Sequence, residues 1–139
     1  VMGIAQPGGS TPPVIGTSMS ETDRSYVLSV NRVISNGATL LYGDMELQIR
    51  DNTGLARVIG SLRDCVDDLG ADDKVEQFIV INDNSGVISP GQWSTTTMGA
   101  GDSLVISKDI DGDGVDDIAP GWKLILTYRS EQIVERAFT

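Results

Sequence analysis

The sequence contains no histidine and a single cysteine, Cys65. The lack of histidine removes the usual general base near neutral pH and the commonest ligand of transition metals. One cysteine can form neither an intrachain disulfide nor a multi-cysteine zinc or iron–sulfur site. No Gly-x-Ser-x-Gly motif and no marked pair of carboxylates stands in for these groups. The sequence therefore predicts a protein that is not an enzyme.

Aromatic side chains are scarce as well, at 5% of 139 residues, whereas apolar residues make up 40%. This length and composition predict one globular domain whose core is built mostly from valine, isoleucine and leucine. The formal net charge of −10 repels phosphate backbones and anionic lipids. Nucleic acid is therefore excluded as a partner, and the domain itself, which has no transmembrane stretch, is not expected to bind membranes.

The beginning of the chain differs in character from the rest. Apolar residues 1–5 run into the Gly/Pro-rich stretch QPGGSTPP at residues 6–13. Such a stretch is typical of a flexible or polyproline-like linker. We expect residues 1–13 to be the end of a hydrophobic helix followed by a linker, and residues 14–139 to form a β-rich head domain.

Several short segments alternate apolar and polar residues with the period of a β-strand. They are SYVLSVNRVI, MELQIR, KVEQFIVIND, GDSLVIS, GWKLILTYR and EQIVERAFT. Turn signals separate them: residues 35–37 (SNG) predict a hairpin, residues 82–86 (NDNSG) a turn, and Ser130 the last hairpin. This pattern predicts a mainly β protein with an antiparallel β-sandwich or barrel.

The apolar period changes to that of a helix near residue 54. The sequence predicts one inserted α-helix at about 54–69, capped by Asn52 or Thr53 and ended by Gly70. Its apolar stripe would face a sheet and bury the thiol of Cys65. The stripe consists of Leu55, Val58, Ile59, Leu62, Cys65, Val66 and Leu69.

Five aspartates lie within nine residues at the start of the stretch DIDGDGVDDIAP, residues 109–120. Their carboxylates repel one another, and no basic residue lies among them. Calcium loops take oxygen ligands from alternate residues and place glycine at the sixth position, as Gly114 is placed here. The candidate Ca²⁺ ligands, at positions 1, 3, 5, 7 and 9, are Asp109, Asp111, Asp113, the carbonyl of Val115 and Asp117.

The end of this stretch departs from the helix–loop–helix calcium motif. Pro120 stands where a bidentate glutamate is expected, and a strand pattern follows. The sequence therefore predicts a calcium loop between two strands, with a further ligand from Asp116, Asp102 or water. Without the glutamate the affinity should be weak, as in extracellular modules. The alternative is an acidic turn that binds no ion.

Two tryptophans, Trp93 and Trp122, are candidates for stacking on a ligand. Each follows a Pro-Gly pair next to a strand pattern. Packing in the core or at its rim is the commoner role of tryptophan in such places, and we favour it here.

Three parts of the chain together resemble archaeal type IV pilins and related flagellin-like proteins. The stretch VMGIAQPGGSTPPV resembles the end of the family's N-terminal helix and its linker. The segment LSVNRVISNGATLLYGDMELQI resembles the first hairpin of the family, and PGQW, AGDSLVI and APGWKLILTYRSEQIVERAFT resemble its last strands. The helix at 54–69 and the aspartate loop look like insertions into that plan.

The resemblance implies an immunoglobulin-like or pilin-type head on a filament subunit. Copies of the chain would assemble through an N-terminal helix, and the heads would face outward, outside the cell, for assembly or adhesion to a surface. Two other functions stay open. One is a calcium-stabilised extracellular module that binds a sugar or another cell-surface ligand. The other is an accessory subunit of the archaeal motility filament.

Overall fold

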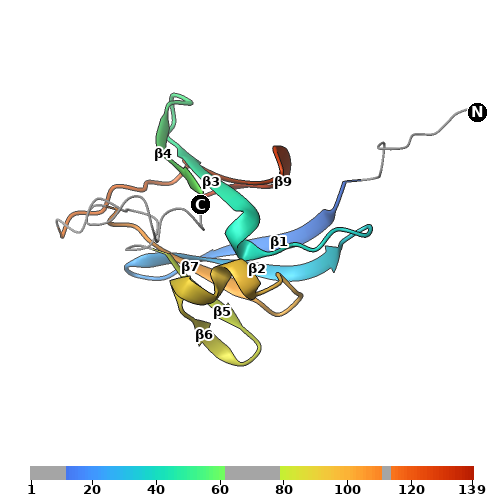
Figure 1. The fold of residues 1–139 in the computed structure, drawn as a ribbon. Coiled ribbons are helices and arrows are strands. Elements are labelled where there is room, and N and C mark those ends of the chain that lie inside the picture. The colour runs from blue at the N-terminus through green and yellow to red at the C-terminus, as the bar shows by residue number, and fades with distance from the viewer. Residues whose placement is uncertain (1–11, 62–78, 111–113) are drawn as a thin grey trace, which may run out of the picture.

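The computed structural model describes residues 12–61, 79–110 and 114–139, and they form two antiparallel β-sheets (Figure 1). Short 3-10 helices, named η1 and η3, connect some of the strands. The elements in chain order are β1 (Val14–Glu21), β2 (Ser25–Ile34), η1 (Tyr42–Asp44), β3 (Met45–Arg50), β4 (Ala56–Ser61), β5 (Ile79–Asp83), β6 (Gly86–Ile88), η3 (Pro90–Thr95), β7 (Ser103–Ser107), β8 (Lys123–Tyr128) and β9 (Glu131–Ala137).

The two sheets face each other across the core. One has the strand order β1-β2-β7-β5-β6 and the other the order β4-β3-β8-β9. The five-stranded sheet lies below the four-stranded sheet in Figure 1. Every second residue of β2, namely Tyr26, Leu28 and Val30, is buried between them, and β7 and β8 alternate in the same way. The predicted mainly β, antiparallel sandwich is confirmed.

The few aromatic side chains are concentrated in the core. Every aromatic residue in the described ranges is buried, and the rings of Tyr26 and Phe138 lie 4.8 Å apart between centroids. Trp93 and Trp122 are buried too, so the packing role favoured for them is confirmed. Burying a ring such as that of Phe138 contributes roughly 1.5–3 kcal/mol. Most of the remaining core consists of valine, isoleucine and leucine, as predicted.

An arginine of the last strand joins the two sheets at one edge. Arg136 of β9 donates from Nε to the Thr17 Oγ1 at 2.9 Å, and from Nη2 to the Thr17 carbonyl. The register of β1 against β2 shifts between Gly16 and Thr17. A bulge of this kind bends a strand and interrupts its pairing. Arg136, which comes from the other sheet, therefore bonds to β1 next to the point where the pairing of β1 with β2 is interrupted.

The predicted helix at 54–69 is wrong over residues 56–61, which form the edge strand β4. Val58 is buried opposite Ile49 of β3, whereas Ile59 pairs with Gln48 and is 66% exposed. The adjacent apolar pair Val58 and Ile59 suits one face of a helix, but in a strand the two side chains point to opposite faces. Burial of Val58 against β3 therefore decides the conformation. Residues 62–69, with Cys65, lie outside the described residues.

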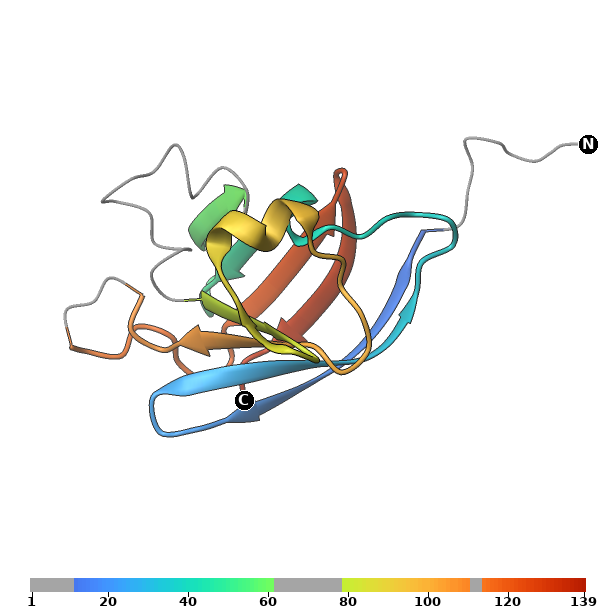
Figure 2. The same cartoon turned by 60° about the horizontal axis from the view of Figure 1, so that its bottom comes forward.

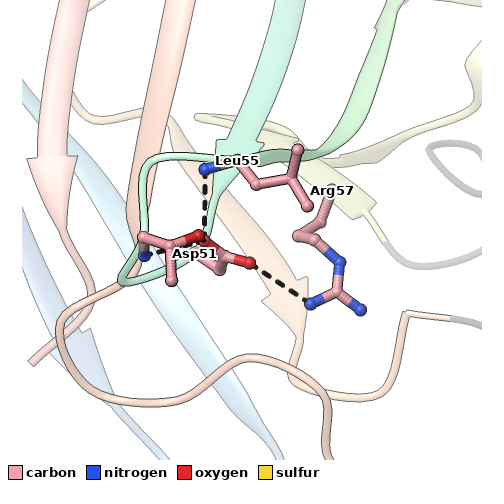
Figure 3. A network of polar contacts seen from close by, with 4 residues as sticks. Asp51, Leu55 and Arg57 are labelled. Atoms are coloured by element: carbon pink, nitrogen blue, oxygen red, sulfur yellow. Dashed lines mark hydrogen bonds and ion pairs between the residues drawn. The ribbon is translucent and has the colours of Figure 1, made fainter.

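The residues expected to cap that helix form the loop of the β3–β4 hairpin (Figure 3). Asp51 Oδ1 accepts hydrogen bonds from the backbone N of Thr53 at 2.8 Å, from its Oγ1 at 2.6 Å and from Leu55 N at 3.2 Å. Gly54 has a φ of +87°, which a tight turn requires. Asp51, rather than Asn52 or Thr53, is thus the capping side chain, and it caps a turn.

A turn also follows β2, but it does not form the predicted hairpin. Asn36 and Gly37 have φ values of 51° and 88°, the left-handed conformation that the Asn-Gly pair predicts. Nevertheless β2 pairs with β1 and β7, and the chain crosses through η1 to β3 in the other sheet. Leu40 and Tyr42 are buried along this crossing. The packing of these two side chains decides that the chain enters the other sheet after the turn. The sequence of the turn itself gives no information about which sheet follows.

Two other predicted turns do join hairpins. Asp83 of β5 pairs with Gly86 of β6, so residues 84–85 form a two-residue loop. Arg129 and Ser130 join β8 to β9 with φ values of 49° and 69°. Both residues have the left-handed conformation that suits a tight hairpin turn.

Candidate functional site

The aspartate loop connects β7 of the five-stranded sheet to β8 of the four-stranded sheet (Figure 1). Of the five candidate ligands, the structure describes Asp109, Val115 and Asp117. Asp111 and Asp113 lie outside the described residues.

Backbone and side-chain hydrogen bonds close the base of the loop. The Lys108 carbonyl accepts from Asp117 N at 2.7 Å and from Ile118 N at 3.0 Å. The Oδ2 of Asp117 accepts from Ile110 N at 2.8 Å. Asp117, the candidate ligand at position 9, therefore lies beside the residues that begin the loop.

The first aspartate also closes the loop onto its glycine. Asp109 Oδ2 accepts from Gly114 N at 2.7 Å, which brings positions 1 and 6 into contact. Gly114 has a φ of +87°, as expected for a glycine at the turn position. Among the residues that the structure describes, no three acidic, histidine or cysteine side chains are close enough together to hold a metal ion. The calcium site stays a prediction.

A lysine with a nearly buried side chain stands at the base of the loop. Lys108 Nζ donates to the Oε2 of Glu21 at 2.5 Å, across 87 positions of sequence. The hydrogen bond that Lys108 donates to Glu21 raises the pKa of Lys108, although burial acts in the other direction. The contact arises because Ser25 of β2 pairs with Ser107 of β7, which sets the β1–β2 turn beside Lys108. No local sequence signal reports such a pair.

The ring of Tyr26 lies against the same lysine. Lys108 Nζ is 5.2 Å from the ring centroid, a favourable position over an aromatic face. The Tyr26 hydroxyl is buried and has no hydrogen-bond partner among the described residues. Burial raises the pKa of Tyr26, and the charge of Glu21 raises it further. The ammonium group of Lys108 thus stands at the base of the acidic loop, and the charge of Asp116 also raises its pKa.

Asp102, which the sequence offered as an extra calcium ligand, belongs to a different cluster. It precedes β7, whereas the aspartate loop follows that strand. Its Oδ2 accepts from the Tyr42 hydroxyl at 2.6 Å and from Gly99 N at 2.9 Å, and the residue is 3% exposed. Burial, together with the bond to Asp102, raises the pKa of Tyr42. Asp102 and the aspartate loop thus lie at opposite ends of β7, and this placement does not support the suggestion that Asp102 supplies a further calcium ligand.

A hollow of about 450 Å³ lies at the end of β2 that is remote from the aspartate loop. Tyr128 OH donates to the Thr39 carbonyl at 2.8 Å, and the Arg129 guanidinium lies 5.4 Å from the Tyr128 ring centroid. Asn36 Nδ2 donates to the Pro12 carbonyl at 2.7 Å. The hollow is lined by Pro12, Pro13, Asn36, Gly37, Ala38, Thr39, Tyr128, Arg129 and Glu131.

Comparison of the chain with protein-family models, with curated proteins and with solved structures gave no match. Within the described ranges, no helix has the length and the apolar character needed to cross a membrane.

Proposed function

We propose that this chain is the outward-facing head domain of a structural subunit in an extracellular filament of the archaeal type IV pilus kind. Its role is assembly or adhesion to a surface, and calcium stabilises it. The mainly β sandwich supports the proposal, as do the sequence resemblances at 1–14, 28–49, 90–93, 100–106 and 119–139. The protein has a structural rather than a catalytic function.

The closed base of the aspartate loop is the observation that carries the calcium part of the proposal. Asp109 bonds to Gly114 and Asp117 bonds to Ile110, so the two outermost candidate carboxylates are held at the start of the loop. The loop sequence supplies Asp111 and Asp113 between them. A cation with several oxygen ligands would offset the repulsion of these carboxylates. The loop would then fasten the crossing from one sheet to the other.

Calorimetric titration tests this part directly. Calcium added at millimolar concentration should give a saturable heat with a stoichiometry of one ion per chain. Magnesium should bind more weakly, because it demands a strict octahedral geometry and gives up its water reluctantly. No heat with calcium would leave an acidic turn, and the calcium part of the proposal would be withdrawn.

The filament part has a separate test in the full-length protein. The proposal predicts a cleavable basic leader and about 20 apolar residues upstream of the head, enough for a membrane-spanning helix. The processed protein should be recovered from sheared cell-surface filaments. A conventional signal peptide, or recovery as a secreted soluble protein, would contradict this part and leave the calcium result unaffected.

A calcium-stabilised extracellular binding module is the second candidate, and the hollow near Arg129 favours it. Its lining combines an arginine, a glutamate, an asparagine and backbone groups, which suits a polar ligand such as a sugar. Titration with cell-surface oligosaccharides, followed by NMR of residues 36–39 and 128–131, tests this function. The absence of shifts there would remove the second candidate.

A further inference from the structure

The outer face of the five-stranded sheet carries no charged side chain across the middle of its strands, and its charged Arg32, opposite Gly16 of β1, lies toward the end of β2. Within residues 18–20, 25–29, 80–82, 87 and 103–107, the side chains that alternate with the buried ones belong to serine, valine or asparagine. One row across the sheet runs from Ser20 through Val27 and Val105 to Val80, as the strand registers give it. We call this surface the valine–serine face. Figure 2 turns it toward the viewer.

The outer face of the other sheet has the opposite character. Its outward positions include Glu46 and Arg50 of β3, Lys123 of β8 and Glu135 of β9. Lys123 and Glu135 form an ion pair at 3.3 Å. Charged residues make up 22% of the chain and its net charge is −10, so an uncharged patch across the middle of a sheet stands out from the composition. Aliphatic groups are exposed on it: Val80 is 43% and Val87 69% exposed.

The chemistry of the valine–serine face is complementary to itself. A serine hydroxyl both donates and accepts hydrogen bonds, and valine methyl groups pack against one another. A contact between two copies across a two-fold axis uses the same patch on both sides, so it requires such self-complementarity. The net charge of −10 makes copies of the chain repel one another, and an uncharged patch adds no like charges at the contact itself. We infer that the valine–serine face is the surface through which two copies of this chain associate.

The size of the face sets the strength of the association. With strands about 4.8 Å apart and about 6.8 Å between alternate residues, the face covers roughly 350 Å² per copy. Stable interfaces bury about 600 Å² or more on each partner. The contact is therefore weak in dilute solution, where the net charge also opposes it. It becomes populated where copies are held close together or are highly concentrated. It needs neither the filament nor the calcium of the proposed function.

Salt dependence distinguishes this contact from one based on ion pairs. Salt screens the repulsion between two chains of charge −10 but leaves packing of uncharged faces intact. Sedimentation equilibrium of the 139-residue chain, from micromolar to millimolar concentration, should show a monomer–dimer equilibrium that shifts toward dimer with added sodium chloride. NMR signals of Val27, Val80 and Val105 should broaden with concentration. Weakening by salt, or no association at millimolar concentration, would overturn the inference.

A matched pair of variants locates the contact. Val105→Glu places a like charge on each copy at the centre of the face and should weaken association at least tenfold. Ile125→Glu adds the same charge at the centre of the other sheet's outer face and should leave association near that of the parent chain. Val80→Glu, at a more exposed site, serves as a second variant if Val105→Glu lowers the melting temperature markedly. Equal effects of the two glutamates would overturn the inference, as would no effect of either variant on the face.

Discussion

The Tyr42 hydroxyl donates a 2.6 Å hydrogen bond to the Oδ2 of Asp102, and both residues are buried. Tyr42 lies in η1, on the crossing from β2 to β3, and Asp102 lies just before β7. Asp102 further accepts from Gly99 N at 2.9 Å, and its carbonyl accepts from Val30 N at 2.9 Å. Asp102 thus links its own turn at residues 99–102 to two other segments, η1 through its carboxylate and β2 through its backbone carbonyl, and these bonds satisfy buried polar groups.

Removing the tyrosine hydroxyl should destabilise the fold because the buried carboxylate loses a partner. We expect Tyr42→Phe to lower the free energy of unfolding by about 1–3 kcal/mol, measured by urea denaturation at neutral pH. Tyr128→Phe is the matched control, since the Tyr128 hydroxyl donates to a neutral carbonyl, that of Thr39. Its cost should be about 1 kcal/mol. An equal or larger loss for Tyr128→Phe would argue against a special role for the pair.

The raised pKa of Tyr42 gives a prediction at alkaline pH. Unfolded tyrosine loses its proton near pH 10, whereas folded Tyr42 keeps it to higher pH. As the pH rises, deprotonation of this tyrosine therefore stabilises the unfolded state before it affects the folded state. The contribution of Tyr42 to the free energy of unfolding is complete below pH 10 and falls as the pH rises above 10. Unfolding free energies of the parent chain and Tyr42→Phe, measured from pH 8 to 11, should converge as the pH rises. Two curves that stay parallel over this pH range would show that Tyr42 does not cause the loss of stability at alkaline pH.

The β3–β4 loop gives a prediction at acidic pH. Hydrogen bonds from the Thr53 side chain, together with those from the backbone and Arg57, lower the pKa of Asp51. The stability that Asp51 contributes is complete above the ordinary aspartate pKa of about 4 and is lost as the pH falls through its lower folded value. Asp51→Asn should therefore flatten the acid end of the stability curve, followed by denaturation between pH 2 and 6.

A matched variant separates this effect from loss of charge. Asp23 is exposed, and its carboxylate accepts no hydrogen bond from the described residues. Asp23→Asn removes the same charge from another turn and should leave the curve unchanged. If Asp23→Asn flattens it as much as Asp51→Asn does, the hydrogen bonds of Asp51 are not the cause.

The sandwich could be predicted because apolar and polar residues alternate along its strands, and this alternation is visible in the sequence. Along β2 and β8 each buried residue alternates with a less buried one, and this period is local information. β4 could not be predicted in the same way. Its neighbouring Val58 and Ile59 fit a helix as well as a strand, and only β3, paired alongside, buries one of them and exposes the other.

In the candidate site, too, local features could be predicted from the sequence, whereas contacts between distant residues could not. Gly114 could be placed at the turn of the loop from spacing alone, and its positive φ agrees. The ion pair of Lys108 with Glu21 and the bond of Asp102 to Tyr42 could not be foreseen, because 87 and 60 positions of sequence separate the partners. The strand registers that create these contacts are properties of the assembled sheets.

The calcium proposal leads to a prediction about stability. A ligand that binds only the folded state stabilises it by mass action, by about 2.7 kcal/mol when calcium is a hundredfold above its dissociation constant. Chelation should therefore lower the melting temperature of the parent chain. Hydrogen exchange should show that residues 109–120 lose protection before β1 and β2 do, because the ion holds the loop and not the distant hairpin.

Exchanging one carboxylate should remove this dependence without disturbing the base of the loop. Asp111→Asn takes away a candidate ligand, while the bonds of Asp109 to Gly114 and of Asp117 to Ile110 involve other residues. We expect this variant to melt at the same temperature with calcium and with chelator, and near the temperature of the chelated parent. Glu46→Gln, an exposed and charge-matched change on β3, should keep the full calcium response. A calcium response retained by Asp111→Asn would place the ion elsewhere. A parent chain that chelator does not affect would leave the loop as an acidic turn, closed by the hydrogen bonds of Lys108, Asp109 and Asp117.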